Sequence, residues 1–204
     1  MIKRQALLEI LHAGELYEQL VKDIASCMAW IDMLDDQFAR RQYVRSVFAL
    51  VEALTYRIKQ IVYGLYTQGD CALAPGEADL LAEVSYGIDS RGKVSRRGAK
   101  LRTVGNTRFA LQMLAQHAAP GYVLNWNDNG WVSLQTALKV RHRLTHPKGL
   151  DDLNVSDKDL EVVKRGFEWY RVTLIGAFKH ASELHRLQFE NLTGLSVADE
   201  TEHQ

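Results

Sequence analysis

Cysteine and proline are both scarce, with two cysteines and three prolines in 204 residues. Two distant cysteines, Cys27 and Cys71, are too few for a disulfide framework, so we expect free thiols. Three prolines leave most of the chain free to form long helices. The N-terminal residues lack the apolar run of a signal peptide, and no stretch approaches the roughly 18 apolar residues of a membrane span. The sequence therefore predicts a soluble protein of the cytoplasm.

The chain also lacks a net charge, because 25 basic residues balance 25 acidic ones. A general cationic coat for nucleic acid is excluded, so any such binding needs a local patch. Apolar residues make up 47% of the chain, which is ordinary for a globular protein. This length favours a single domain with its own core. We expect one helical domain over residues 1–195 and a polar, acidic, frayed tail over residues 196–204.

Apolar residues recur at steps of three and four over several long segments, which predicts helices. Long helices are expected over residues 5–36, 42–66 and 131–145, and from a Ser156–Asp159 capping box to about residue 195. Shorter helices are expected over residues 77–87, directly after Pro75-Gly76, and over residues 108–117. Residues 86–107 resemble a long loop or irregular hairpin. The prediction is an all-α, up-and-down bundle of about four long helices with extra short helices and a basic loop.

Positive charge is concentrated in KVRHRLTHPKG, residues 139–149, where Pro147 ends a helix. Arg141 and His146 can reach one ligand from this turn. An arginine offers a planar fork of donors to a phosphate, and a histidine transfers protons near neutral pH. Metal-free RNA cleavage needs these two functions, to activate the ribose 2′-hydroxyl and to stabilise the phosphate. A solvated helix end, whose positive charges favour the helix dipole, is the competing interpretation.

His142 and His146 also have the spacing of two metal ligands on a helix. No acidic residue or cysteine lies nearby in the sequence, and four flanking cations repel a divalent ion. Pro147 also disturbs the helix at the second ligand. We therefore expect no metal and no other cofactor, since an anion fits this segment better.

At these residues the sequence resembles the HEPN superfamily (higher eukaryotes and prokaryotes nucleotide-binding domains). Its members are helical bundles that carry an Arg-x4-6-His motif near a helix end, often with a polar residue after the arginine. Here RHRLTHP supplies Arg141, His142 and His146. The order of long helices around the motif is also similar, so the resemblance covers most of the chain, although only the motif is specific.

The resemblance implies a metal-independent endoribonuclease, of the kind found in toxin, phage-defence and RNA-processing settings. It implies a homodimer with a composite cleft, in which His146 transfers the proton, Arg141 binds phosphate, and His142 orients the site or contacts RNA. An antitoxin or effector protein is a further implied partner. Some members have lost cleavage, so the alternative is a non-catalytic bundle that binds RNA, a nucleotide or a protein. One toxin subgroup has a modifiable tyrosine two residues after the histidine, where this chain has Lys148.

Glu52 lies on the polar face expected for the second helix, together with Arg45, Tyr56 and Lys59. A carboxylate there can hold Arg141 in place, whereas a solvated face with local ion pairs is the structural alternative. A third interpretation of the chain is a purely structural dimerisation bundle. That interpretation gains support if Arg141 is buried in an internal ion pair.

The run RGKVSRRGAKLR, residues 91–102, has six basic residues and no acidic one. Its cations can add salt-dependent affinity for RNA, or the loop can simply be solvated. Trp126 and Trp131 flank a polar turn before the motif, where they either stack on bases or pack in the core. The candidate RNA-binding residues are Arg143, Lys148, Arg96, Arg97 and Lys100.

Overall fold

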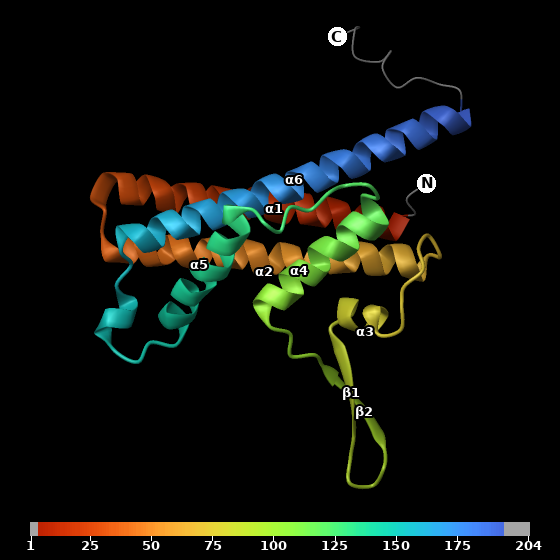
Figure 1. Ribbon diagram of the computed structural model, residues 1–204, viewed down its shortest axis with the longest axis horizontal. Helices are drawn as coiled ribbons and strands as arrows, with labels where there is room; N and C mark the ends of the chain where they lie inside the picture. The colour runs from red at the N-terminus through yellow and green to blue at the C-terminus, as the bar shows by residue number, and fades with distance from the viewer. Residues whose placement is uncertain (1–3, 194–204) are drawn as a thin grey trace, which may run out of the picture.

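The computed structural model describes residues 4–193, so the predicted tail at 196–204 lies outside the described residues. Three long helices, α1 (Arg4–Leu34), α2 (Gln37–Thr67) and α6 (Asp157–Thr193), run along the long axis of the molecule (Figure 1). Two further helices, α4 (Thr103–Met113) and α5 (Asn129–Thr145), slant across α2. The predicted all-α bundle is confirmed. None of the described helices is both long and apolar enough to cross a membrane.

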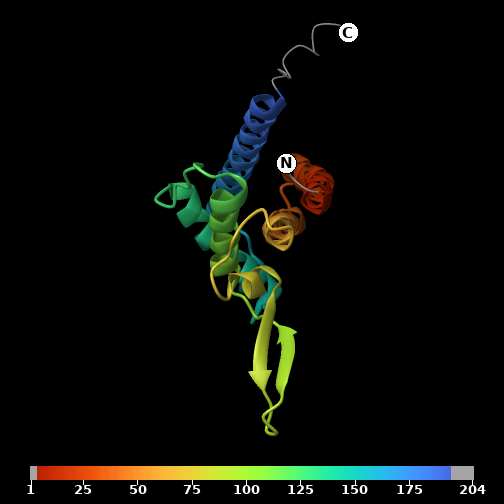
Figure 2. The same ribbon diagram turned by 90° about the vertical axis from the view of Figure 1, so that its right-hand side faces the viewer.

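A β-hairpin projects from this bundle, as Figures 1 and 2 show. Its antiparallel strands pair in a regular register. The second strand lies in the segment that was expected to be a loop or an irregular hairpin. The first strand begins at Val84, within the helix expected after Pro75, which instead ends at Leu81. The next helix begins at Thr103, earlier than the expected start near residue 108. The shorter elements of the chain are α3 (Glu77–Leu81), β1 (Val84–Ile88), β2 (Val94–Gly98), the π-helical turn η1 (Leu114–Ala118) and the 3-10 turn η2 (Leu150–Leu153).

The core lies around α2, whose predicted apolar stripe is buried. Each large aliphatic or aromatic side chain contributes about 1.5–3 kcal/mol when it is fully removed from water. The stripe of α6 faces the same core, and α5 packs against α6. The buried apolar residues at steps of three and four are Tyr43, Val47, Leu50, Leu54, Ile58 and Ile61 on α2, and Leu160, Val163, Tyr170, Leu174, Ala177 and Ala181 on α6.

Lys59 departs from the polar face predicted for α2, because its side chain is fully buried. Its ammonium group forms an ion pair with Glu83 and donates a hydrogen bond to Oδ1 of Asn106 at 2.9 Å. Glu83 directly precedes β1, and Asn106 lies in α4. A buried charge needs such partners, because an unpaired one is costly. Of the two alternatives for this polar face, the solvated one does not hold at Lys59, and the residue fixes the base of the hairpin to the bundle.

Capping residues explain two helix starts. Asp36 caps α2 by accepting a hydrogen bond from the backbone N–H of Ala39 at 2.6 Å, so this helix begins at Gln37, earlier than the expected start at residue 42. The predicted capping box is also present at α6. The Ser156 backbone N–H donates to Asp159 Oδ2 at 3.0 Å, and the Asp159 N–H donates to Ser156 Oγ at 3.2 Å.

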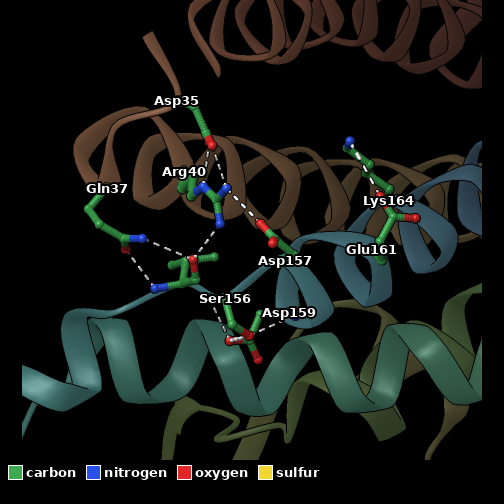
Figure 3. A network of polar contacts seen from close by, with 9 residues as sticks. Asp35, Gln37, Arg40, Ser156, Asp157, Asp159, Glu161 and Lys164 are labelled. Atoms are coloured by element: carbon green, nitrogen blue, oxygen red, sulfur yellow. Dashed lines mark hydrogen bonds and ion pairs between the residues drawn. The ribbon is translucent and has the colours of Figure 1, made fainter. Parts of the chain in front are cut away.

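A polar network joins the α1–α2 turn to the segment that leads into α6 (Figure 3). The Arg40 guanidinium contacts Asp35 at 2.7 and 2.8 Å and Asp157 at 2.7 Å. Gln37 exchanges two hydrogen bonds with the backbone of Val155, at 2.7 and 3.1 Å. These contacts hold the chain between the end of α5 and the start of α6, directly after the predicted motif.

Candidate functional site

The helix α5 carries the motif and ends where Pro147 was predicted to stop it. Its N-cap, Asp128, accepts a hydrogen bond from the backbone N–H of Gly130 at 2.5 Å. At the other end, His146 is the C-cap, and its backbone N–H donates to the carbonyl oxygen of His142 at 3.0 Å. The His146 side chain is exposed at this helix end. Backbone geometry therefore fixes the residue and leaves its imidazole accessible.

Arg141 is held by a carboxylate from a neighbouring helix. Its Nη2 atom lies 2.9 Å from Oε1 and 3.2 Å from Oε2 of Glu52, which belongs to α2. The two side chains are 27% and 40% exposed. Of the two interpretations of Glu52, the structure favours the one in which its carboxylate holds Arg141. The pair is not buried, so it does not match the internal ion pair expected of a purely structural bundle.

An open hollow of about 400 Å³ lies beside this ion pair, between α2 and α5. Arg45 contributes a second guanidinium to its lining, and its side chain is exposed. The sequence placed Arg45 on the same helix face as Glu52, seven residues earlier, but gave it no role. Two arginines and one carboxylate make the hollow cationic on balance, which suits an anion. The lining consists of Arg45, Phe48, Ala49, Glu52, Arg141, Leu144 and Thr145.

The two motif histidines lie close to one another. The ring centroids of His142 and His146 are 5.1 Å apart, with 59° between the ring planes. Within residues 4–193, no hydrogen bond joins the His146 ring to Arg141. The same part of the chain holds no group of three histidine, cysteine, aspartate or glutamate side chains placed to bind a metal ion. Within residues 4–193, neither a direct bond nor a metal-binding group links His146 to Arg141, so a ligand that uses both residues must contact each side chain itself.

Arg143 is half-buried, and its guanidinium is engaged in contacts within the protein. Its Nη2 atom donates to Asp159 Oδ2 and to the carbonyl oxygen of Asn154, both at 2.7 Å. Burial alone would raise the pKa of the Asp159 carboxyl, but hydrogen bonds from Ser156 and the charge of Arg143 lower that pKa overall. This geometry favours a structural role for Arg143, tying the end of α5 to the start of α6, over contact with RNA.

The remaining candidate cations are exposed but dispersed. Lys148 directly follows the motif, and its backbone N–H donates to Asp152 Oδ2 at 2.7 Å, while its side chain is exposed. Arg96 and Arg97 lie in β2, and Lys100 follows it. The hairpin projects from the bundle, and none of its residues lines the hollow (Figure 1). The structure therefore has two separate cationic surfaces.

The tryptophans before the motif are packed together. The ring centroid of Trp131 lies 4.9 Å from that of Trp126 and 5.2 Å from that of Trp169 on α6. The guanidinium of Arg108 lies 4.9 Å from the Trp126 ring. Of the two interpretations of these tryptophans, packing is therefore the one that the structure favours. The cluster supports the start of α5.

Comparison with known proteins identifies no relative of this chain. No family model, no curated protein and no solved structure matches the chain. Function is therefore inferred from the residues of the hollow, the end of α5 and the hairpin.

Proposed function

We propose that the chain is a HEPN-like, metal-independent endoribonuclease whose reacting groups are Arg141 and His146. The observation that carries this proposal is the half-exposed ion pair of Arg141 with Glu52 at an open cationic hollow. Among the residues that the structure describes, Arg141 donates to the carboxylate through its Nη2 atom alone, which leaves its other N–H groups for a phosphate. A guanidinium that is oriented before the ligand arrives loses less entropy on binding.

The proposed reaction needs no cofactor. His146 removes the proton of a ribose 2′-hydroxyl, and the 2′-oxygen attacks the adjacent phosphorus. The bond from phosphorus to the 5′-oxygen breaks, which leaves a 2′,3′-cyclic phosphate on one fragment. The departing 5′-oxygen takes up a proton from a second acid or from water. Arg141, with Arg45 nearby, stabilises the negative charge that develops on the phosphate.

The proposed assembly is a homodimer in the cytoplasm, in which two motifs meet in one cleft. His142 and Lys148, both exposed beside His146, are placed to orient the site or contact RNA. A toxin or phage-defence role, with an antitoxin or effector protein as partner, is part of the same proposal. It rests on the resemblance of the RHRLTHP motif to the HEPN superfamily.

A second candidate is a non-catalytic bundle that binds RNA. His146 is not among the residues that line the hollow beside Arg141, which favours this candidate, as does a cationic surface outside the hollow. Such a protein binds RNA with salt-sensitive affinity and forms no product. Product formation therefore separates the two candidates.

Replacing Arg141 with lysine is expected to slow RNA cleavage by about 10²-fold, as for the loss of one oriented donor to a developing oxyanion. Lysine keeps the charge but lacks the planar fork that contacts Glu52 and a phosphate together. The measurement is the initial rate on a fluorescent RNA in excess EDTA. The matched control is Arg165→Lys, an exposed arginine of α6 outside the hollow, which should cleave at the wild-type rate. An unchanged rate in Arg141→Lys would contradict the proposed phosphate ligand.

A further inference from the structure

The charge of the hairpin is separated from that of the bundle. The hairpin, residues 84–98, holds four basic residues and one acidic residue, Asp89. The rest of the chain holds 21 basic and 24 acidic residues, so it is negative where the hairpin is positive. The hairpin also projects away from the helices, as both views show (Figures 1 and 2). The arm is therefore a surface that attracts a polyanion, separate from the cationic hollow on the bundle.

One face of the hairpin is apolar and exposed. The strand register places Tyr86 opposite Arg96 and Ile88 opposite Val94, and side chains two residues apart share a face. Tyr86, Ile88 and Val94 are 57%, 73% and 62% exposed. Contiguous apolar side chains on a projecting arm are costly in water and mark a surface that binds a partner.

The opposite face of the hairpin is different in kind. It carries Ser85, Gly87, Ser95 and Arg97. A Cβ atom at Gly87 would lie 1.4 Å from Nη2 of Arg97, so the Arg97 guanidinium lies directly over this glycine. That face therefore has small polar residues and one cation, Arg97, but no aromatic ring. The Tyr86 face combines an aromatic ring with the Arg96 cation. Proteins bind the bases and phosphates of single-stranded nucleic acids with this combination.

The hairpin is attached to the bundle at its base and is closed by hydrogen bonds within its turn at the tip. At its base, Glu83 pairs with the buried Lys59, and its carbonyl oxygen accepts a hydrogen bond from the Ala99 N–H at 2.8 Å. At its tip, Asp89 Oδ1 accepts backbone hydrogen bonds from Arg91 and Lys93, each at 2.9 Å. A two-stranded hairpin alone is marginally stable in water, so these contacts preorganise the arm. The hydrogen bonds of the Asp89 carboxylate are made within the turn, to the backbone N–H groups of Arg91 and Lys93.

We infer that the Tyr86 face of the hairpin binds unpaired bases of single-stranded RNA, with Tyr86 stacking on a base and Arg96 contacting the phosphates. Duplex RNA fits less well, because its bases are stacked inside and its major groove is too narrow for side chains. The inference rests on the proposed function for its choice of RNA, and it names the substrate class as single-stranded. Binding at the hairpin does not require cleavage at the motif.

The test uses the full-length His146→Ala variant, so that RNA survives the measurement. Fluorescence anisotropy gives the affinity for a labelled 12-nucleotide polyuridine RNA and for a 12-base-pair RNA duplex. Replacing Tyr86 with alanine or leucine in this background is expected to weaken single-strand binding about tenfold, whereas Tyr86→Phe keeps it within about twofold, because stacking needs only the ring. Leucine preserves bulk on the strand, so a loss in both variants reports the ring and not the hairpin fold. Tyr66→Ala, at an exposed tyrosine of α2, is the matched control and should bind normally.

Two results would overturn the inference: unchanged binding in Tyr86→Leu, or equal affinity for the duplex. The outcome is separable from that of the proposed nuclease. Tyr86-dependent binding by a wild-type chain that never cleaves RNA would refute the nuclease and support the hairpin. Cleavage by the wild-type chain, with binding that ignores Tyr86, would do the reverse.

Discussion

Alanine in place of His146 is expected to slow RNA cleavage by about 10²- to 10⁴-fold, which is the usual contribution of a general acid or base. The imidazole is exposed at the end of α5, and the helix end is held by the backbone N–H of His146, which alanine retains. The variant should therefore fold and lose only the proton transfer. Initial rates on a labelled RNA in excess EDTA measure the effect, and circular dichroism checks the fold.

A matched control for this variant is His12→Ala. His12 is an exposed histidine of α1, and it lies outside the hollow. Its removal should leave the cleavage rate unchanged. If His146→Ala cleaves RNA as fast as the wild type, the assignment of proton transfer to His146 is wrong.

Alanine at Gly166 is expected to destabilise the fold by separating α5 from α6. A Cβ atom there would lie 2.7 Å from both the Cα and the backbone N of Leu134, so backbone and not a flexible side chain must move. We expect an overpacking cost of about 3 kcal/mol, which exceeds the gain of about 1 kcal/mol in helix propensity and leaves a net loss of about 2 kcal/mol. Urea unfolding followed by circular dichroism measures the free energy of unfolding.

The matched control for Gly166 is Gly14, which lies in the middle of α1 with nothing within 4 Å of a Cβ atom. Gly14→Ala should raise the free energy of unfolding by about 1 kcal/mol, through helix propensity alone. The two substitutions are chemically identical and should have opposite signs. A Gly166→Ala protein as stable as the wild type would show that α5 can shift freely on α6.

Local signals in the sequence predicted the helices well. The Ser156–Asp159 capping box and the stop at Pro147 are each visible as a residue type at a fixed offset, and both are present. The start of α4 was misplaced because Arg102, at its N-cap, makes no side-chain capping bond and so leaves no signal in the sequence. Residues 86–107 were expected to form a loop or an irregular hairpin, and the regular strand pairing there was not predicted.

Contacts between distant residues were beyond the reach of these patterns. The burial of Lys59 depends on Glu83, 24 residues away, and the position of Lys59 on α2 indicates a solvated face. The engagement of Arg143 by Asp159 similarly depends on how α5 meets α6. The pairing of Glu52 with Arg141 was one of two alternatives, since periodicity shows which face a residue occupies but not which helix lies opposite. The Arg141–His146 motif can be recognised in the sequence, but the Glu52 ion pair and the hollow beside it can be seen only in the structure.

The most direct measurement is the cleavage of one RNA and of the DNA of the same sequence by the wild-type protein in excess EDTA, with mass spectrometry of the products. The proposed mechanism predicts RNA fragments that end in a 2′,3′-cyclic phosphate, together with intact DNA, because the attacking group is the ribose 2′-hydroxyl. Cleavage that requires a divalent ion, fragments with a 3′-hydroxyl end, or cutting of the DNA would contradict it.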